Sequence, residues 1–365
     1  MLPEKTGIGP GLMFMLLYTA ILSFGLTDAS HIEAKYIGHN GYLGILLAFI
    51  LMLPIILIAV DLGKKFPDKS IIEYLPHIFG NAFGKILGFI FLLFLFAITA
   101  WSLKSVVDVS NIYFLQRTPD SVILFAVLLT SVYISLKGIE TISRLAAFVF
   151  PLALIFTVLV IALSYKNVDL DQIRPVFYFD GFKLPMGSLH SANMFFPLAL
   201  VFMTYQYLTE KTKGRQIIIW ASALASLLMF SIVFGTLGVF GAEGTLRYHW
   251  SLIELTWQAD IPFILQTFGM FLFIVWMTQL LITISALNYV IAQGLTELFS
   301  TLNYKWFILI LFLPMFFLLT SVTGGPLVLQ LFTYLRISGL AVIVLIPLVS
   351  WLLVRFLGRG EPTDA

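Results

Sequence analysis

Ten long apolar runs follow one another along this chain and constrain its fold more than any other feature. About 20 residues of helix cross the roughly 30 Å of hydrocarbon in a bilayer, so each run is a candidate membrane span. Backbone groups inside a bilayer must bond internally, and runs of this length do so as helices. The sequence therefore predicts an all-α multi-pass membrane protein with about ten transmembrane helices. The expected spans are 11–29, 41–60, 84–113, 120–137, 144–164, 187–208, 216–241, 262–293, 304–322 and 329–357.

The composition supports this class and excludes others. The 365 residues are 60% apolar and 11% charged, with a mean hydropathy of +1.00, which is far above that of a soluble domain. The absence of cysteine excludes a disulfide framework and thiol catalysis. No nucleophile–base constellation or metal-ligand cluster stands out, so we expect no enzymatic activity and no cofactor or metal. A net charge of +2 does not suggest a nucleic-acid partner.

The loops and the basic residues predict the organisation and the sides. No loop is long enough to fold alone, so residues 1–365 are expected to form a single transmembrane domain. The first run lacks a preceding basic region and a cleavage site, and is interpreted as a retained span. An even number of spans places both termini on one side. With both termini in the cytoplasm, Lys and Arg are about twice as frequent inside as outside, as the positive-inside rule requires.

Two charges inside an expected span are the strongest functional signal. Lys104 and Asp108 lie one helical turn apart in 84–113, where each can offset the charge of the other. Each would cost at least about 2.5–3.5 kcal/mol at the bilayer centre, so such residues often mark a functional path. Two interpretations stay open: an ion pair that locks helices together, or a gate or proton path in the outer half of the span.

Two expected spans carry interruptions. In the first, small and polar residues run from Ser23 to Ser30 and include Gly25, Thr27 and Asp28; in the sixth, Pro197 removes a backbone donor. One interrupted helix at the start of each of two five-helix halves indicates an inverted-repeat transporter with a site near the midplane. The alternative is that Ser23, Gly25 and Ser30 are packing residues and that Asp28 reaches the outer interface.

Three motifs occur in order along the chain: Leu115-Gln-Arg-Thr-Pro119, Gly138-Ile-Glu-Thr-Ile-Ser-Arg-Leu145 and Asn167-Val-Asp-Leu-Asp-Gln-Ile-Arg-Pro-Val176. With them, the chain resembles the B subunits of GerA-type spore germinant receptors, over essentially its whole length. The resemblance implies membership in the endospore germination permease family, within the amino acid–polyamine–organocation superfamily. It also implies the LeuT-like five-plus-five inverted repeat, with the first repeat at about 11–164 and the second at about 187–357.

The chain departs from the family pattern at three places. Lys104 and Asp108 stand where Arg and Glu are better known, which keeps the signs of the charges. The glycine-rich break of the first span is reduced to Ser23-Phe24-Gly25-Leu26, and Asp28 stands where proline is common. Pro197-Leu-Ala-Leu200 replaces an occasional Gly-x-Glu, so no acid is available there to meet a ligand amine.

The resemblance implies a nutrient-sensing subunit of a germination receptor in the inner membrane of the spore. It would bind a small molecule such as an amino acid and act with A-type and C-type receptor subunits. A proton-coupled amino acid or amine transporter is the alternative. We expect the pocket between spans 1, 3, 6 and 8, and a gate or proton path beside it. The expected pocket residues are Gly25, Leu26, Thr27, Trp101, Ser105, Phe195 and Phe196, and the gate or proton-path residues are Lys104, Asp108 and Asp28.

Overall fold

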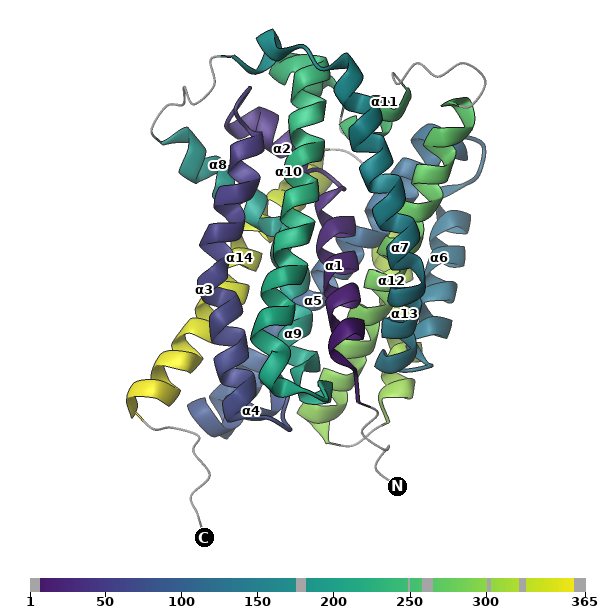
Figure 1. Ribbon diagram of the computed structural model, residues 1–365. Helices are drawn as coiled ribbons and strands as arrows, with labels where there is room; N and C mark the ends of the chain where they lie inside the picture. Colours follow the sequence, from purple (N-terminus) through teal and green to yellow (C-terminus); the bar gives the residue numbers. More distant parts are fainter. Residues whose placement is uncertain are drawn as a thin grey trace.

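The computed structural model describes residues 7–174, 182–248, 250–257, 265–300, 303–321 and 326–357 (Figure 1). The last two residues of the third motif, Pro175 and Val176, lie outside this part. The α-helices are α1 (Pro10–Gly25), α2 (Ala29–Tyr36), α3 (Tyr42–Lys65), α4 (Ile71–Phe79), α5 (Asn81–Val109), α6 (Asp120–Ser135), α7 (Ile139–Ser164), α8 (Lys183–Ser191), α9 (Ala199–Thr204), α10 (Gly214–Arg247), α11 (Ser251–Trp257), α12 (Leu265–Phe299), α13 (Tyr304–Ser321) and α14 (Pro326–Leu357). Short 3₁₀ segments are η2 (Tyr165–Asn167), η3 (Leu170–Ile173), η4 (Ala192–Leu198), η5 (Tyr205–Tyr207) and η6 (Lys211–Lys213), and η1 (Ser110–Phe114) is a π-turn.

The predicted all-α multi-pass class is confirmed. Within the described residues, 8 helical segments are long and apolar enough to cross a membrane, and the bent pair α1–α2 makes 9. The remaining expected span, 120–137, corresponds to α6, which is apolar but has only 16 residues. Helix α4 is too short to cross and lies at one end of the bundle (Figure 1).

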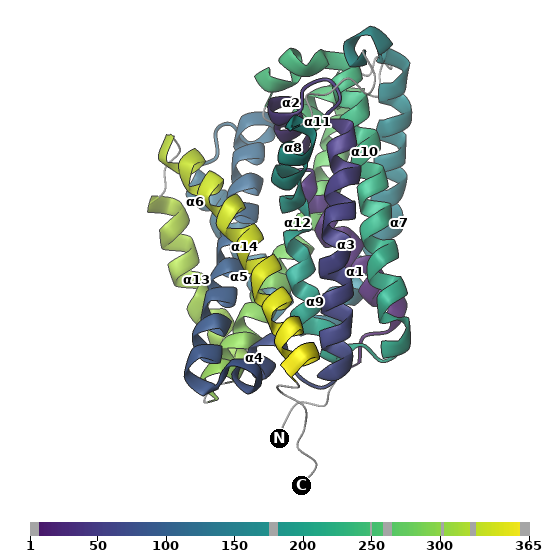
Figure 2. The same ribbon diagram turned by 90° about the vertical axis from the view of Figure 1, so that its left-hand side faces the viewer.

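The bundle is built around α1. This helix packs against α7, α10, α12 and the 3₁₀ segment η4, and its residues from Leu16 to Gly25 are buried. Helices α6 and α13 stand together on one side, next to α5 and α12 (Figure 2). Helix α14 crosses α3 and α5 on the outside of the bundle. A helix that is apolar all round belongs in the core of such a bundle, which is where α1 lies.

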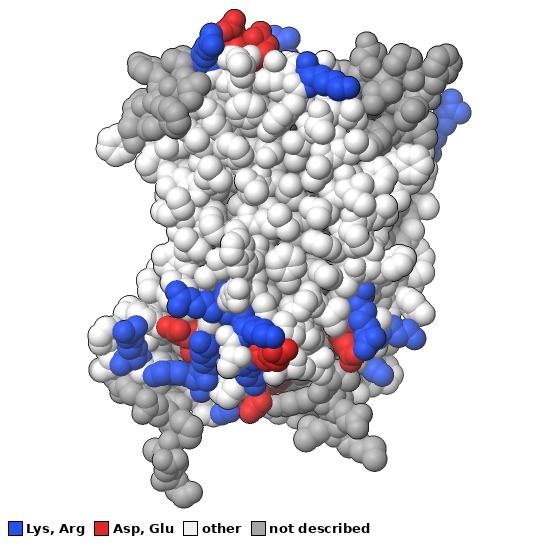
Figure 3. All heavy atoms as spheres, viewed as in Figure 1, with Lys and Arg blue, Asp and Glu red and all other residues white. Residues whose placement is uncertain are grey.

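The surface has the pattern expected of a membrane protein. Apolar side chains such as Phe148 (81% exposed) and Ile155 (63%) cover the flanks, which face hydrocarbon. Charged residues gather at the two ends, and Lys and Arg are more numerous at the end where α1 begins and α14 finishes (Figure 3). We call this the inner end and the opposite one the outer end, following the predicted orientation.

Candidate functional site

The first span is broken at Leu26, Thr27 and Asp28. Helix α1 ends at Gly25, Asp28 has φ −155° and ψ 3°, and α2 continues at an angle of 53° to α1. A local side chain satisfies one of the backbone carbonyls at the break, because the Thr27 hydroxyl donates to Phe24 O at 2.7 Å. Broken backbone at membrane depth occurs where it is buried in protein or lines a cavity. The interruption predicted from Ser23 to Ser30 is therefore a true break in the helix, at 26–28.

Helix α12 supplies partners to the end of α1. The indole N–H of Trp276 donates to Ser23 O at 3.1 Å, and the hydroxyls of Ser23 and Thr283 share a hydrogen bond at 3.0 Å. Trp276 and Thr283 lie seven residues apart and so point from the same face of α12. Two turns of α12 therefore hold the end of α1 in place.

The sixth span is also interrupted. It runs as α8, the 3₁₀ segment η4 and the short helix α9, and Pro197 lies inside η4. A 3₁₀ stretch of seven residues in mid-span is longer than usual and is often found at hinges. The two breaks meet, because a Cβ atom added to Gly25 would lie 3.3 Å from Cβ of Met194.

A charged pair covers the break on its outer side. Arg336 of α14 donates to Asp28 Oδ2 at 2.5 Å, and its guanidinium lies 5.7 Å from the ring centroid of Trp101. Asp28 is 3% exposed and Arg336 17% by side chain, so the pair is nearly excluded from water. The Trp101 indole N–H donates to Thr27 Oγ1 at 3.4 Å. Spans 1, 3 and 10 are thus linked at one point.

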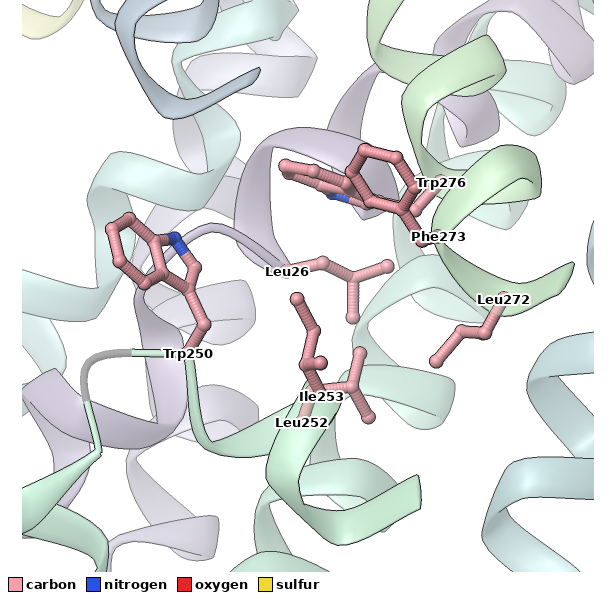
Figure 4. Close-up of a pocket in the computed structure, with 7 residues that line it drawn as sticks. All are labelled: Leu26, Trp250, Leu252, Ile253, Leu272, Phe273 and Trp276. Carbon is pink, nitrogen blue, oxygen red and sulfur yellow. The ribbon is translucent and has the colours of Figure 1, made fainter. Parts of the chain in front are cut away.

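An apolar cavity of about 20 Å³ lies beside the break (Figure 4). Leu26 points into it between residues of α11 and α12. The lining residues are Leu26, Trp250, Leu252, Ile253, Leu272, Phe273 and Trp276. A second cavity of about 10 Å³ adjoins Leu26, Thr27 and Asp28. Volumes of this size hold about one water molecule, so an amino acid requires the surrounding helices to separate.

The expected pocket residues divide into two groups. Leu26, Thr27 and Trp101 come together at the break. Phe196 of η4 packs edge-on against Phe94 at 5.1 Å and lies 6.2 Å from Phe24, near the end of α1.

The other three expected residues make other contacts. Gly25 faces Met194 and Met229, and Phe195 faces Phe49 of α3 at 6.3 Å. The Ser105 hydroxyl donates to Trp101 O within its own helix. The structure thus does not bring Phe195 and Phe196 onto one wall.

Lys104 and Asp108 form an ion pair with side-chain exposures of 11% and 31%. Lys104 lines a separate cavity of about 250 Å³ toward the outer end, between α5, α6 and α13, together with Asp120 and Thr320. This cavity is separate from the break, because Leu26, Thr27 and Asp28 are not among the residues that line it. The role of the ion pair as a gate or proton path stays a prediction.

A second link ties the inner ends of the two broken spans. Ile8 N–H donates to Tyr207 O at 2.7 Å and Thr209 N–H donates to Ile8 O at 3.1 Å, which makes an isolated parallel bridge. Gly7 allows the approach, since a Cβ there would lie 2.3 Å from Thr209 Cγ2. We call this contact the inner strap. Both ends of the break are therefore closed in this conformation.

Sequence reasoning missed three of these features. Arg336 is a charge in the expected span 329–357, but nothing in the sequence identifies Asp28 as its partner. Thr283 gave no signal, because hydroxyl residues are ordinary in membrane helices. The inner strap joins residues 200 positions apart and has no local pattern.

Comparisons with known proteins agree with this architecture. The sequence model of the family described as "Spore germination protein" matches residues 8–324. Spore germination protein B2 of Bacillus subtilis (strain 168) is 22% identical over 357 residues, which are 95% of this chain and 96% of that protein. Spore germination protein YndE of the same organism is 23% identical over 264 residues, 72% of each chain.

Two solved transporters share the fold. MhsT in complex with L-phenylalanine is 14% identical with a TM-score of 0.68, over 97% of this chain and 92% of that one. A substrate-bound, outward-open Na⁺-coupled sialic acid symporter is 13% identical with a TM-score of 0.69, over 98% and 79% of the two chains. The expected LeuT-like fold is confirmed.

Proposed function

Because this chain belongs to the spore germination protein family, we propose that it is the nutrient-sensing membrane subunit of a spore germination receptor. Family and fold together make it a germinant-sensing or transporter-like membrane protein. The proposal goes further, to a ligand and a response. A small molecule such as an amino acid binds where the two broken spans meet, and its binding triggers germination.

The observation that carries this proposal is the Asp28–Arg336 pair above the break. A zwitterionic amino acid has an ammonium that suits the Asp28 carboxylate and a carboxylate that suits the Arg336 guanidinium. Beside the pair, Leu26, Phe273 and Trp276 offer an apolar wall for a side chain. A site with an apolar wall and few polar anchors is the usual form of a small-molecule pocket.

The small cavities support a mechanism in which binding changes the conformation. The ammonium and the carboxylate of the ligand bind Asp28 and Arg336 and replace the contact between these two residues. Helices α2 and α14 therefore separate as the ligand enters. A ligand that prefers the separated state shifts the equilibrium by its difference in affinity for the two states. A preference of about 5.5 kcal/mol would convert a 1:99 population into 99:1.

The proposed setting follows from the family. A- and C-type receptor subunits are the proposed partners that read the change, in the inner membrane of the spore. The cluster of basic residues at the inner end supports cytoplasmic N- and C-termini (Figure 3).

Binding to the purified protein tests the site. We expect one or a few amino acids from a panel to raise the midpoint of thermal unfolding, because a ligand that binds only the folded state stabilises it by RT ln(1 + [L]/Kd). The change Arg336→Gln should lower the affinity at least about tenfold, since a hydrogen bond to a charged group is lost.

Arg144→Gln is the matched control. Arg144 is exposed and pairs with Glu140 one turn away on the same helix, far from the break. If Arg336→Gln binds the same amino acid as tightly as Arg144→Gln does, the pair is not part of the site.

A proton-coupled amino acid or amine transporter is the second candidate. The likeness to two transporter structures over almost the whole chain favours it. Accumulation of a labelled amino acid in proteoliposomes under a proton gradient would support transport. Spores that lack the gene and fail to germinate on that amino acid, together with proteoliposomes that bind but do not accumulate it, would support the receptor.

A further inference from the structure

Glu33 lies on α2 and its carboxyl group is buried. The residue is 0% exposed, and neither carboxyl oxygen has a hydrogen-bond partner among the described residues. Ser191 of α8 faces the carboxyl, but its hydroxyl donates to Gly187 O at 3.2 Å. The expected first span ended at residue 29, which placed Glu33 in a loop at the outer end. Instead, the chain continues after the break at 26–28 as helix α2, and this helix carries Glu33 into the bundle.

Three glycines form the groove in which this side of α2 lies. A Cβ on Gly44 of α3 would lie 2.3 Å from one Glu33 carboxyl oxygen and 2.6 Å from the other. A Cβ on Gly41 would lie 2.8 Å from Glu33 Cβ, and one on Gly187 of α8 would lie 2.2 Å from Ile37 Cγ1. The groove therefore fits α2 closely and leaves no room for an ion at the Gly44 side.

The titratable groups on the helices around Glu33 make other contacts. Just before α2, Asp28 pairs with Arg336, and on α2 itself Lys35 lies 5.5 Å from the ring centroid of Tyr36. On α8, His190 stacks on Tyr36 at 3.9 Å.

Among the described residues, no group on the other helices around Glu33 pairs with its carboxyl. The Tyr42 hydroxyl of α3 donates to Asn40, and Glu254 of α11 accepts from Tyr113. His31 of α2 has an interaction partner of its own. Helix α10 carries Glu243 and Arg247 near its outer end, and neither makes an ion pair or hydrogen bond with Glu33 among the described residues.

A carboxylate ion without a partner is costly in such a place. Burial of an isolated ion costs far more than burial of the neutral acid, so the group takes up a proton instead. We propose that Glu33 is a proton-binding site, and that the bound proton holds α2 in the glycine groove. Loss of the proton leaves a charge that must reach water, which requires α2 to leave the groove. The proton and the outer half of the broken span are therefore coupled, whichever solute binds at the break.

The direction of the coupling follows from linkage. The state with α2 in the groove, which we call seated, holds one more proton on Glu33 than the displaced state with α2 out of the groove. Raising the pH therefore favours the displaced state, and the ratio of displaced to seated protein rises by up to about tenfold per pH unit. The change Glu33→Gln gives a neutral side chain of the same size and removes this dependence. Glu33→Asp retains a titrating carboxyl.

The natural absence of cysteine allows a direct test on the full-length protein in liposomes. Ala34 is 5% exposed on α2, so a thiol in Ala34→Cys is protected while α2 is seated. Its labelling rate is divided by that of the exposed Lys166→Cys, which cancels the effect of pH on thiol chemistry. The ratio should rise several-fold with pH in the otherwise unchanged protein and stay constant in Glu33→Gln.

Infrared spectroscopy provides a readout that does not depend on the cysteine. The protein should show a carbonyl stretch from a buried protonated carboxylic acid, which disappears on alkaline titration. Glu33→Gln should weaken it, Glu33→Asp should shift part of it, and Glu140→Gln, whose natural carboxylate pairs with Arg144, should leave it unchanged. A labelling ratio that rises with pH in Glu33→Gln as steeply as it does with the natural glutamate, or a band that is as strong in Glu33→Gln as with the natural glutamate, would overturn the proposal.

Discussion

Four charged residues inside the bundle form two close pairs, and the pairing decides what their substitution does. Lys104 and Asp108 were visible in the sequence because both lie on one helix, four residues apart. Asp28 and Arg336 lie 308 positions apart, and only the packing of α14 over the break brings them together. A sequence identifies a charge that needs a partner, but the partner on another helix is decided by tertiary packing.

The Lys104–Asp108 pair gives a prediction at the residue scale. Lys104→Ala should lower the free energy of unfolding by about 1–3 kcal/mol, since it removes the ion pair with Asp108, whose side chain is 31% exposed. The double change Lys104→Ala with Asp108→Ala should cost less. Thermal unfolding of the purified protein measures both.

The same variants separate stability from function. Germination by spores that carry each variant gives the functional readout. If the single and double variants lose germination equally while the double variant keeps its stability, the two residues do more than pair with each other.

Among the elements, the long apolar helices were predictable and the broken ones only in part. Mean hydropathy and length located the spans because a bilayer imposes both on every crossing helix. Ser23, Gly25 and Pro197 indicated breaks because they weaken helices. The short α6 and the course of the chain through η4 could not be predicted, since contacts with neighbouring helices decide how an interrupted span continues.

Gly339 of α14 gives a prediction at the scale of helix packing. A Cβ there would lie 2.7 Å from Phe196 Cζ and 2.8 Å from Phe94 Cε2. Gly339→Ala should therefore displace the aromatic pair that joins α5 to η4 beneath α14, at a cost of about 1–3 kcal/mol in unfolding free energy. It should also weaken ligand binding at the break.

Gly11→Ala is the control for this substitution. Gly11 also lies in a helix, and nothing lies within 4 Å of a Cβ added there. Alanine at that position should leave stability unchanged or raise it by up to about 1 kcal/mol. Equal midpoints of thermal unfolding for the two variants would contradict the packing account.

At the scale of the whole molecule, the conformation described is closed at both ends of the break. The Asp28–Arg336 pair covers the outer side and the inner strap covers the inner side. The all-α membrane class and the positions of most spans were predictable from the sequence. The closed state was not, because each closure depends on residues that are distant in the chain and close only in the folded bundle.

The inner strap can be opened by a single substitution. Gly7→Val places a side chain where Thr209 now lies, so the bridge between Ile8 and Leu208 should be lost. Thr204 at the inner end of α9 is 0% exposed, and a thiol in Thr204→Cys should then be labelled from the inner side several-fold faster. Gly9→Val is the matched change, since nothing lies within 4 Å of a Cβ at Gly9. Equal labelling in both variants would mean that the strap does not close this end.

The strap also constrains the order of events during biosynthesis. Ile8 is made long before its partners Tyr207 and Thr209, which follow only after the first five expected spans have been synthesised. Contacts so distant in sequence form late, because the conformational entropy lost in closing the long loop must first be compensated by other contacts. The segment around Ile8 must therefore remain unpaired at the membrane surface until the sixth span is complete, and a nascent chain that stops before residue 208 should not be able to close its inner end.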